Sequence, residues 1–439
     1  MPLVYDDAPL GLACVLYAVT GHGEGRQNEE GMHMRTSVKF GLNTFGLGLA
    51  GAALLVGLGG VAQAQTKEPM KVGGLFSTTG GGASVGISAA VAAKMAIEDI
   101  NKAGGILGRQ VVMLQGDDAT DTTQAVNETK RLVLGEKVEI MFGPLFSPPT
   151  LAAANAVMKD HTAITYWSFA TSGAITVDIG PTLFPAGPSG DVFAETMVDY
   201  AVNVRKAKRI ALLLDDAGQS VLVINKIKEL MKARGVTAVA EQQMPMGTTD
   251  PTPNLLALRR ANADFIIYSN QAPPDAGRVF KTMDELGWDV PVAGNNGFVV
   301  NYGAIARVAG PGIRNLAAGV GVKAFTYCTG DAPGTSAYAK FLVRLKQYVP
   351  NLDANASIVQ MAEMYDIIMI AKAAAEAVGS TDGKKMTEWL ETKGGTLETI
   401  SGKLFLSKTN HFLQVGESLT MAENLDKMRS DGLYKRAGC

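Results

Sequence analysis

Short runs of apolar residues recur along the chain, and each is bounded by glycine, proline, aspartate or asparagine. Amphipathic or alanine-rich stretches of helical length follow these runs. Strands buried on both faces have continuous apolar sequences of this kind, and their alternation with helices is typical of parallel sheets. We therefore predict an α/β fold with parallel central sheets. The predicted strands cover residues 71–76, 111–114, 138–142, 163–167, 209–214, 236–239, 265–268 and 290–293.

The strand–helix units fall into two blocks, which predicts two lobes. The first block runs from about residue 70 to 187 and contains an alanine-rich helix over 84–103, which Gly104 ends. Residues 183–189 break the pattern, so we predict that the chain crosses there into a second block over 189–319. Two later elements, a long helix and a hairpin, are predicted within 357–378 and over 400–406.

An uncharged stretch near the start of the chain has the features of a signal peptide. Residues 41–65 are mostly leucine, valine, alanine and glycine, with Arg35 and Lys39 before them. The small-x-small sequence Ala62-Gln63-Ala64 closes the stretch, so we predict a signal peptide at about 34–64, cleaved after Ala64. An uncleaved anchor helix is the alternative, which the many glycines disfavour.

The residues before this predicted signal peptide carry the wrong charge for the start of a signal peptide. They contain five acidic residues and a single arginine, whereas a leader begins with positive charge. We therefore expect translation to begin at Met32 or Met34, and residues 1–64 to be an upstream extension plus the signal peptide. Export through such a leader predicts a periplasmic location.

Composition excludes several classes of function. The chain has 40 basic and 42 acidic residues, without the basic excess that nucleic-acid or membrane-surface binding needs. Beyond the leader, His161, His411, Cys328 and Cys439 are too few for a multi-ligand zinc site, and we expect neither metal nor cofactor. In an oxidising compartment Cys328 and Cys439 can pair and fasten the tail; two unpaired thiols are the alternative.

Three predicted loops of the first block follow the carboxyl ends of strands, where parallel α/β sheets bind ligands. They cover residues 77–86, 143–150 and 166–172. The first is rich in glycine and hydroxyl groups but has neither G-x-G-x-x-G nor Gly-Lys-Ser/Thr, so the sequence does not support a nucleotide phosphate loop. The third combines Trp167 and Phe169 with hydroxyl residues. These two aromatics either pack in the core or form a wall for an apolar ligand body.

Ser147 precedes two prolines in the second of these loops. It occupies the position expected of a helix N-cap, with Pro148 as the first helical residue. A helix N-terminus beside a free hydroxyl is a suitable site for a carboxylate. Ser147 can equally cap its own helix, and Pro148 and Pro149 remove two of the N–H groups that an anion would use.

Taken in order, these landmarks resemble the leucine/isoleucine/valine-type periplasmic binding proteins of ABC transporters. The resemblance covers essentially the whole chain after the leader and is most specific in A-I-E-D-I-N-K-A-G-G-I-L-G, which ends at Gly108. The other matching features are Gly80, Asp117-Asp118, Gly143-Pro144, Thr171-Ser172, L-D-D-A-G-Q from Leu214 and W-D-V-P-V-A-G from Trp288.

The resemblance implies a type I periplasmic binding fold, in which two Rossmann-like lobes close on a small solute. Three crossings, near residues 187, 320 and 399, join the lobes. The first lobe is expected to comprise residues 69–187 and 321–398, and the second lobe 188–320 and 399–439.

The resemblance also implies which residues contact the ligand. Ser147 corresponds to the serine that receives the ligand carboxylate. Phe169 and Thr171 correspond to positions that hold the carboxylate and the ammonium through a backbone carbonyl and a hydroxyl. Val85 falls at the aromatic or variable position of the first loop. Two neighbouring aromatic residues complete the expected first-lobe site, Phe146 and Trp167.

Two positions depart from the family pattern. Ala217 stands where the family usually has a tyrosine that covers the ligand from the second lobe, and Asn296 stands where amino-acid binders place an acid for the ligand ammonium. A buried amine without a counter-charge is costly. We therefore expect a ligand with a carboxylate or polar head and no amine, such as an aromatic acid, unless Asp275 or Asp216 reaches the pocket.

The implied function is that of an extracytoplasmic solute-binding component of an ABC import system, not of an enzyme. Its expected partners are a small solute, an inner-membrane permease and the ATPase of that permease, and it is expected to be monomeric. One alternative is a ligand-sensing domain for a signalling partner. Another is an exported hydrolase, which the absence of a G-x-S-x-G sequence disfavours.

Overall fold

The first predicted strand forms as β1 (Met70–Phe76), and its alternating side chains enter two separate apolar layers. Val72 and Phe76 belong to one buried cluster, and Leu75 belongs to another. A sheet that is apolar on both faces must be covered by helices on both faces. Helix α1 (Ala83–Lys102) contacts β1 on the side of the first cluster.

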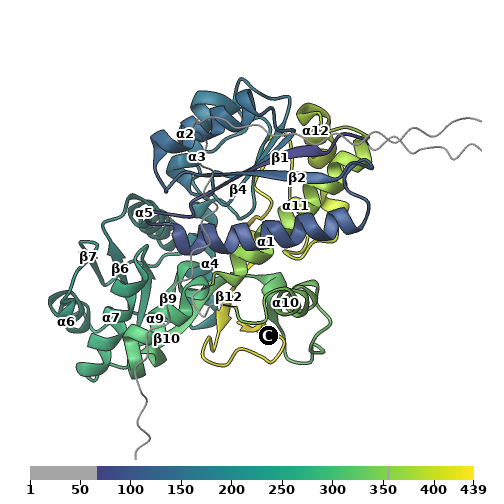
Figure 1. Cartoon of the computed structure of the whole chain (residues 1–439). Coiled ribbons are helices and arrows are strands. Elements are labelled where there is room, and N and C mark those ends of the chain that lie inside the picture. The colour runs from purple at the N-terminus through teal and green to yellow at the C-terminus, as the bar shows by residue number, and fades with distance from the viewer. Residues whose placement is uncertain (1–66, 353–355) are drawn as a thin grey trace, which may run out of the picture. The chain divides into compact units, whose positions relative to one another are not determined.

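The computed structural model describes residues 67–352 and 356–439 (Figure 1). The predicted signal peptide at 34–64 and the predicted starts at Met32 and Met34 lie outside the described residues. Among the described helices, none combines the length and the apolar character that crossing a membrane requires.

A parallel five-stranded sheet contains β1 and has the order β2-β1-β3-β4-β5. This is a doubly wound order, in which ligands bind beside the carboxyl ends of β1 and β3, where the order reverses. Helices α1 and α11 lie side by side in this part of the molecule (Figure 1). The other strands of the sheet are β2 (Val111–Asp117), β3 (Ile140–Phe142), β4 (Thr165–Ser168) and β5 (Leu183–Pro185).

A second sheet within the described residues has eight strands in the order β11-β13-β12-β10-β9-β8-β6-β7. The strands from β7 to β10 are parallel and repeat the same doubly wound order, whereas β12 is antiparallel to both of its neighbours. The strands are β6 (Ile210–Asp215), β7 (Ala240–Met244), β8 (Phe265–Ser269), β9 (Val292–Gly294), β10 (Leu316–Val322), β11 (Thr326–Tyr327), β12 (Leu419–Glu423) and β13 (Tyr434–Arg436).

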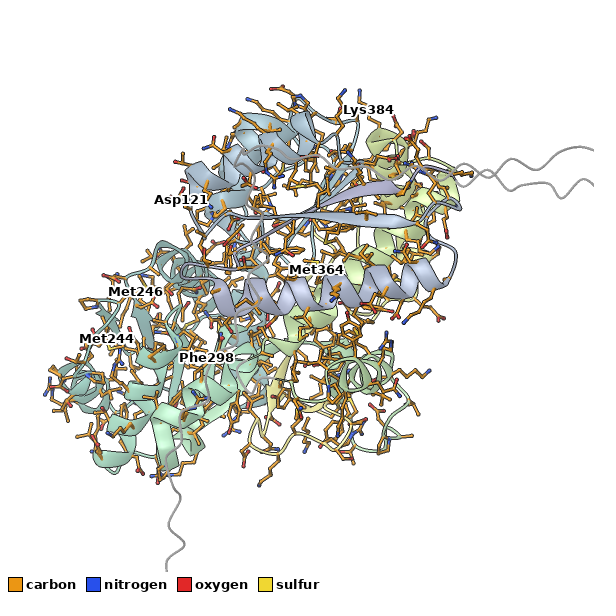
Figure 2. The ribbon with its side chains drawn as sticks, viewed as in Figure 1. Asp121, Met244, Met246, Phe298, Met364 and Lys384 are labelled. Carbon is orange, nitrogen blue, oxygen red and sulfur yellow. A yellow bond between two sulfur atoms is a disulfide. The ribbon has the colours of Figure 1, made fainter. Side chains whose placement is uncertain are left out.

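The helices begin and end where local chemistry favours it. Asp121 accepts a hydrogen bond from the Gln124 backbone at the start of α2 (Figure 2), and Gly379 in the left-handed region ends α11. The remaining helices are α2 (Thr122–Lys130), α3 (Ser147–Ala153), α4 (Gly190–Asp199), α5 (Gly218–Ala233), α6 (Thr252–Arg260), α7 (Pro273–Glu285), α8 (Gly297–Val300), α9 (Tyr302–Ala309), α10 (Ala337–Tyr348), α11 (Ile358–Val378) and α12 (Gly383–Lys393).

The predicted α/β fold with parallel central sheets is confirmed, but two predicted elements are wrong. The strand predicted over 236–239 forms at β7 instead, four residues later. β7 alternates partly buried and exposed side chains and ends at the buried Met244, whereas Met246 is 53% exposed (Figure 2). The hairpin predicted over 400–406 is misplaced: a short antiparallel turn forms over 405–413, where Ser407 and Asn410 exchange backbone hydrogen bonds and Phe405 N–H donates to the Leu413 carbonyl. The Asp366 carboxylate takes the N–H groups of Ile400 and Ser401, which a hairpin ladder would use.

The chain passes between the two sheets more than once. It leaves the first sheet after β5 and enters the second through α4 and β6. After β11 it continues into α10, whose Arg344 pairs with Asp99 of α1, and then into α11 and α12, before it re-enters the second sheet at β12. The residue boundaries of the two lobes remain predictions. The predicted boundary between residues 320 and 321 falls within strand β10.

A disulfide joins Cys328, which follows β11, to Cys439 beyond β13. Their Cα atoms are 5.2 Å apart, a separation typical of disulfides, and the bond closes 111 residues of chain. The bond therefore holds the final segment against β11, beside the parallel pairing of β11 with β13.

Candidate ligand-binding pocket

A pocket opens where both sheets, the segment after β5 and two later helices meet. Its volume is about 750 Å³, open solvent at its mouth included. Concave sites that combine a mostly apolar lining with a few polar groups are typical binding sites for small molecules. The lining residues are Phe169, Thr171, Gly187, Pro188, Phe193, Asn296, Val299, Val300, Val320, Gly321, Val322, Phe325, Thr326, Tyr338, Val359, Gln360, Glu363, Leu419, Ala422 and Tyr434.

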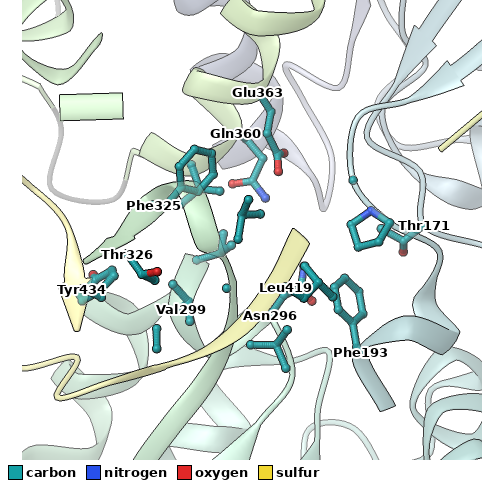
Figure 3. A pocket seen from close by; sticks show the side chains of 18 of the residues that line it. Thr171, Phe193, Asn296, Val299, Phe325, Thr326, Gln360, Glu363, Leu419 and Tyr434 are labelled. Atoms are coloured by element: carbon teal, nitrogen blue, oxygen red, sulfur yellow. The ribbon is translucent and has the colours of Figure 1, made fainter. Parts of the chain in front are cut away.

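Most of the pocket wall is apolar. Phe169 from the loop after β4, Phe193 from α4 and Phe325 before β11 supply aromatic surface, and Val299 of α8 supplies aliphatic surface (Figure 3). The stretch of β10 that contributes to the wall includes Gly321, which adds backbone rather than a side chain. Such a wall suits the apolar body of a small solute.

Several polar groups on the wall have no partner among the residues that the structure describes. Thr171 Oγ1, the Asn296 amide and the Glu363 carboxylate form no hydrogen bond or ion pair with any described residue, although each faces the pocket (Figure 3). Thr326 differs, because its hydroxyl donates to the Lys323 carbonyl at 2.8 Å. The first three are therefore free to bind polar atoms of a ligand.

Ser147 does not line this pocket, but it positions a residue that does. Its Oγ accepts hydrogen bonds from the backbone N–H groups of Thr171 at 3.1 Å and Ser172 at 3.2 Å. The predicted N-cap role of Ser147 is wrong: Phe146 precedes the first helical residue, which is Ser147 itself. Thr171 is further fixed through its carbonyl, which accepts from Gly190 N–H at 2.7 Å.

The first glycine-rich loop is occupied with contacts inside the protein. The Ser77 hydroxyl donates to Asp118 at 2.5 Å, and the Thr79 hydroxyl donates to Asp117 at 2.8 Å. These hydroxyls are therefore not free for a ligand. A Cβ at Gly82 would lie 2.3 Å from the ring of Phe146, so a larger residue there would force this ring to shift where the loops after β1 and β3 meet.

Two further predicted site residues lie near these loops but outside the pocket lining. Val85 and Phe146 are partly buried and pack against the hydrophobic core. Phe146 is held under the glycine-rich loop by the contact with Gly82. Neither residue lines the pocket in this structure.

Trp167 belongs to the core and not to the ligand wall. Its side chain is fully buried, its indole N–H donates to Thr165 Oγ1 at 3.1 Å, and its ring stacks on Phe184 with centroids 4.9 Å apart. Of the two aromatics, only Phe169, two residues beyond Trp167, lines the pocket, and its role as a wall for a ligand stays a prediction. All four residues of β4 are buried, because the strand lies within the sheet between β3 and β5 and is covered on both faces.

Three residues that follow strands of the second sheet, Ala217, Asp216 and Asp275, do not line the pocket. Ala217 does not line the pocket, although its backbone N–H is fixed by Asp215, which also accepts from Gln271 N–H at 2.6 Å. Burial raises the pKa of Asp215. Asp216 accepts from the Met246 backbone, and Asp275 pairs with Arg278, so neither acid replaces the carboxylate missing at Asn296.

An acid that sequence analysis missed lies on the pocket wall instead. Glu363, in the second turn of α11, lines the pocket beside Gln360 and Val359 (Figure 3). Burial is the main cause that raises the pKa of its carboxyl to about 8, and the nearby Asp366 carboxylate adds to it. A signal was present, since Glu363 and Asp366 are the two acids within the mostly apolar residues 358–371 of the helix.

Comparison with known proteins places this fold and pocket in a family. The model of a family described as periplasmic binding protein matches residues 69–423, which is most of the chain. The chain belongs to the periplasmic binding protein family. It is a non-catalytic binding protein, and the predicted type I periplasmic binding fold is confirmed. The expectation that it is not an enzyme follows from this family and not from any group missing in the structure.

Curated relatives of the chain are distant. It is 28% identical over 231 residues to the Leu/Ile/Val-binding protein homolog 8 of Brucella suis, a match that covers 51% of this chain and 57% of that protein. It is 27% identical over 233 residues to the homolog 7 of the same organism, covering 51% and 56%. The chain thus spans little more than half the length of these relatives.

Solved structures share the fold over more of the chain. A branched-chain amino acid transporter substrate binding protein of Streptococcus pneumoniae, in complex with isoleucine, has a TM-score of 0.67 at 23% identity and covers 82% of this chain and 97% of its own. A solute binding protein of Rhodopseudomonas palustris, in complex with 4-hydroxybenzoate, has a TM-score of 0.66 at 18% identity, covering 84% and 96%.

Proposed function

We propose that this protein is the extracytoplasmic solute-binding component of an ABC import system. It binds a small carboxylate-bearing solute, either an aromatic acid or an amino-acid-like molecule, and delivers it unchanged to a membrane permease and the ATPase of that permease. The observation that carries the proposal is the pocket itself, in which an apolar wall surrounds unpartnered polar groups from both sheets, Thr171 and Asn296 among them.

The similar proteins support the solute class. One neighbour of the same fold holds isoleucine and another holds 4-hydroxybenzoate, and the curated relatives are Leu/Ile/Val-binding protein homologs. Both bound molecules combine a carboxylate with an apolar body. The pocket here offers the same combination, since the Thr171 hydroxyl lies beside Phe169 and Phe193 on its wall.

The mechanism we propose is hinge closure. The solute first binds the loop after β4, with its carboxylate at the Thr171 hydroxyl, whose backbone Ser147 holds in place. Contacts from the second sheet, through Asn296 and Val299, then favour the closed state, because a ligand shifts such an equilibrium by its differential affinity for the two states. The two lobes with the boundaries predicted from sequence are the moving bodies, and the segments near residues 187, 320 and 399 are the hinges.

A periplasmic location is part of the same proposal. Disulfides persist in oxidising compartments, so the Cys328–Cys439 bond is consistent with export through the predicted signal peptide. We expect a monomer with no bound cofactor and no affinity for nucleic acid.

Thermal-shift screening of the purified protein tests the proposed function. The solutes are amino acids, aromatic acids, dicarboxylates and fatty acids, each at millimolar concentration. A solute at about one hundred times its dissociation constant stabilises the folded state by about 2.7 kcal/mol, which gives a visible rise in melting temperature. Small-angle scattering with the best solute should then show a smaller radius of gyration.

Two results would contradict the proposal. One is chemical conversion of the recovered solute, which a binding protein does not cause. The other is a scattering profile and a melting temperature that stay the same with every solute in the screen.

A further inference from the structure

Glu363 of helix α11 faces the pocket, and its surroundings differ from those of Asp366 on the same helix. Glu363 lies three residues after Gln360 and four after Val359, spacings that place the three side chains on one helix face. All three line the pocket, and Figure 3 shows Glu363 and Gln360 close together there. The amide oxygen of Gln360 accepts from the Ser357 hydroxyl.

Asp366, on the same helix, provides an internal comparison. Its carboxylate accepts two backbone hydrogen bonds, from Ile400 and Ser401, each at 2.9 Å. Glu363 accepts none from any described residue, and no described cation pairs with it. Of these two acids of α11, Asp366 is satisfied by backbone N–H groups, and Glu363 faces the cavity without a partner among the described residues.

The groups around Glu363 do not supply the missing positive charge. The pocket lining contains no lysine, arginine or histidine among the described residues, and its other titratable side chains are Tyr338 and Tyr434, which are acids as well. Arg436 contacts the lining residue Thr326, but its guanidinium is bound by the Thr326 hydroxyl and the Lys323 carbonyl. The pocket therefore favours a cation over a second anion at this point.

We propose that Glu363 receives a protonated amine of the bound solute, so that the pocket selects molecules that carry an amine on a small apolar body. The proposal rests on the proposed function and narrows its solute class to the amino-acid-like alternative. It replaces the expectation, drawn from Asn296, that the solute lacks an amine. The negative charge that balances the amine comes from Glu363 on α11, instead of from an acid at position 296 in the loop after β9.

Binding of an amine at Glu363 should release a proton. The pKa of Glu363 is raised to about 8, so at pH 7 the carboxyl of the free protein is mostly protonated. Capture of an ammonium ionises it and releases one proton to solvent. Affinity for the amine should then rise by up to about tenfold per pH unit as the pH approaches 8, and level off above it.

Three matched probes with one phenyl ring test the proposal by titration calorimetry. Phenylalanine carries an amine and a carboxylate, phenethylamine carries only the amine, and 3-phenylpropanoate carries only the carboxylate. Each is measured from pH 6 to 9 against the wild type and Glu363→Gln, in two buffers of different ionisation enthalpy to count released protons. Glu376→Gln, on an exposed position of the same helix, is the control variant.

We expect the two amine-bearing probes to bind the wild type with proton release and to lose at least tenfold in affinity in Glu363→Gln, with no loss in Glu376→Gln. The proposal is overturned if 3-phenylpropanoate binds as tightly as phenylalanine, if Glu363→Gln leaves amine binding unchanged, or if neither amine-bearing probe binds. An affinity for 3-phenylpropanoate that falls above pH 8 would show instead that protonated Glu363 donates to a carboxylate.

These failures can be told apart from failure of the proposed function. A solute without an amine that binds and contracts the protein removes the role of Glu363 and leaves the solute-binding proposal in place. If no solute in the wider screen binds, both proposals fall.

Discussion

The Oγ atom of Ser147 lies 3.1 Å from the backbone nitrogen of Thr171, and this hydrogen bond joins the loop after β3 to the loop after β4. The two residues therefore do different things. Thr171 presents a free hydroxyl to the pocket, whereas Ser147 holds the backbone that carries it. Substitutions at the two positions should separate contact with the solute from support of the contact.

Thr171→Val should weaken solute binding without destabilising the fold. Valine keeps the shape of threonine but removes the hydroxyl, which has no partner among the described residues. The loss should be about 1–3 kcal/mol of binding free energy, because a polar group of the solute would be left unsatisfied. Calorimetry measures it, and Thr392→Val on the exposed side of α12 serves as the control. Equal affinity in all three proteins would remove Thr171 from the site.

Ser147→Ala should lower stability as well as affinity. The substitution leaves the N–H groups of Thr171 and Ser172 without their acceptor, at a cost of about 1–3 kcal/mol in the free energy of unfolding. Urea denaturation measures the first effect and calorimetry the second. Ser147→Thr keeps the oxygen and should restore both; if it restores neither, the hydroxyl is not the reason.

Trp167 and Phe169 should respond in opposite ways to replacement by leucine. Trp167→Leu leaves a void in the core and should cost about 2–4 kcal/mol of stability while solute affinity changes less than twofold. Phe169→Leu removes aromatic surface from the pocket wall, so it should weaken binding several-fold with a small change in melting temperature. If Trp167→Leu affected binding more than stability, the core assignment would be wrong.

Removal of the disulfide by Cys328→Ser together with Cys439→Ser should lower the free energy of unfolding by about 2–4 kcal/mol. The reason is the closed loop of 111 residues, which restricts the unfolded chain when the bond is present. Urea denaturation of the wild type with and without reductant should show the same difference. Titration of two free thiols in the denatured, unreduced wild type would show that the bond does not form.

Stability should depend on pH through Glu363. Its pKa is raised from 4.5 to about 8, so the stability associated with the protonated form is fully present below pH 4.5 and is lost as the pH rises through about 8. Glu363→Gln stays neutral. Its melting temperature should match that of the wild type near pH 4.5 and exceed it at pH 9. Calorimetric scans check this, and a difference that does not change with pH would mean that Glu363 titrates normally.

The sequence predicted most of the sheet framework because buried parallel strands have simple patterns. β6 and β8 are apolar at nearly every position, so their location was clear. β7 was misplaced because it lies at a sheet edge and is rich in glutamine and glutamate, which makes its alternation weak beside the apolar stretch before it.

The remaining errors arise from contacts between distant parts of the chain. The hairpin expected over 400–406 is shifted to 405–413, because Ile400 and Ser401 instead donate to Asp366, 34 and 35 residues earlier, which no local pattern shows. In the same way, Glu363 and Asp366 both stand out as acids in an apolar part of α11, and only the packing of α11 against the pocket distinguishes Glu363 as a candidate for binding. Ser147 was correctly singled out, although its partner is the neighbouring loop and not its own helix.

Helix α11 carries both a pocket residue, Glu363, and the anchor of residues 400 and 401, Asp366, less than one turn apart. If a solute at Glu363 shifts this turn of α11, residues 400 and 401 shift with it, because Asp366 holds their backbone N–H groups. An environment-sensitive dye attached at the exposed position of Lys403 would then signal occupancy without touching the cargo. The protein could thus serve as a reagentless fluorescent sensor for whatever it carries.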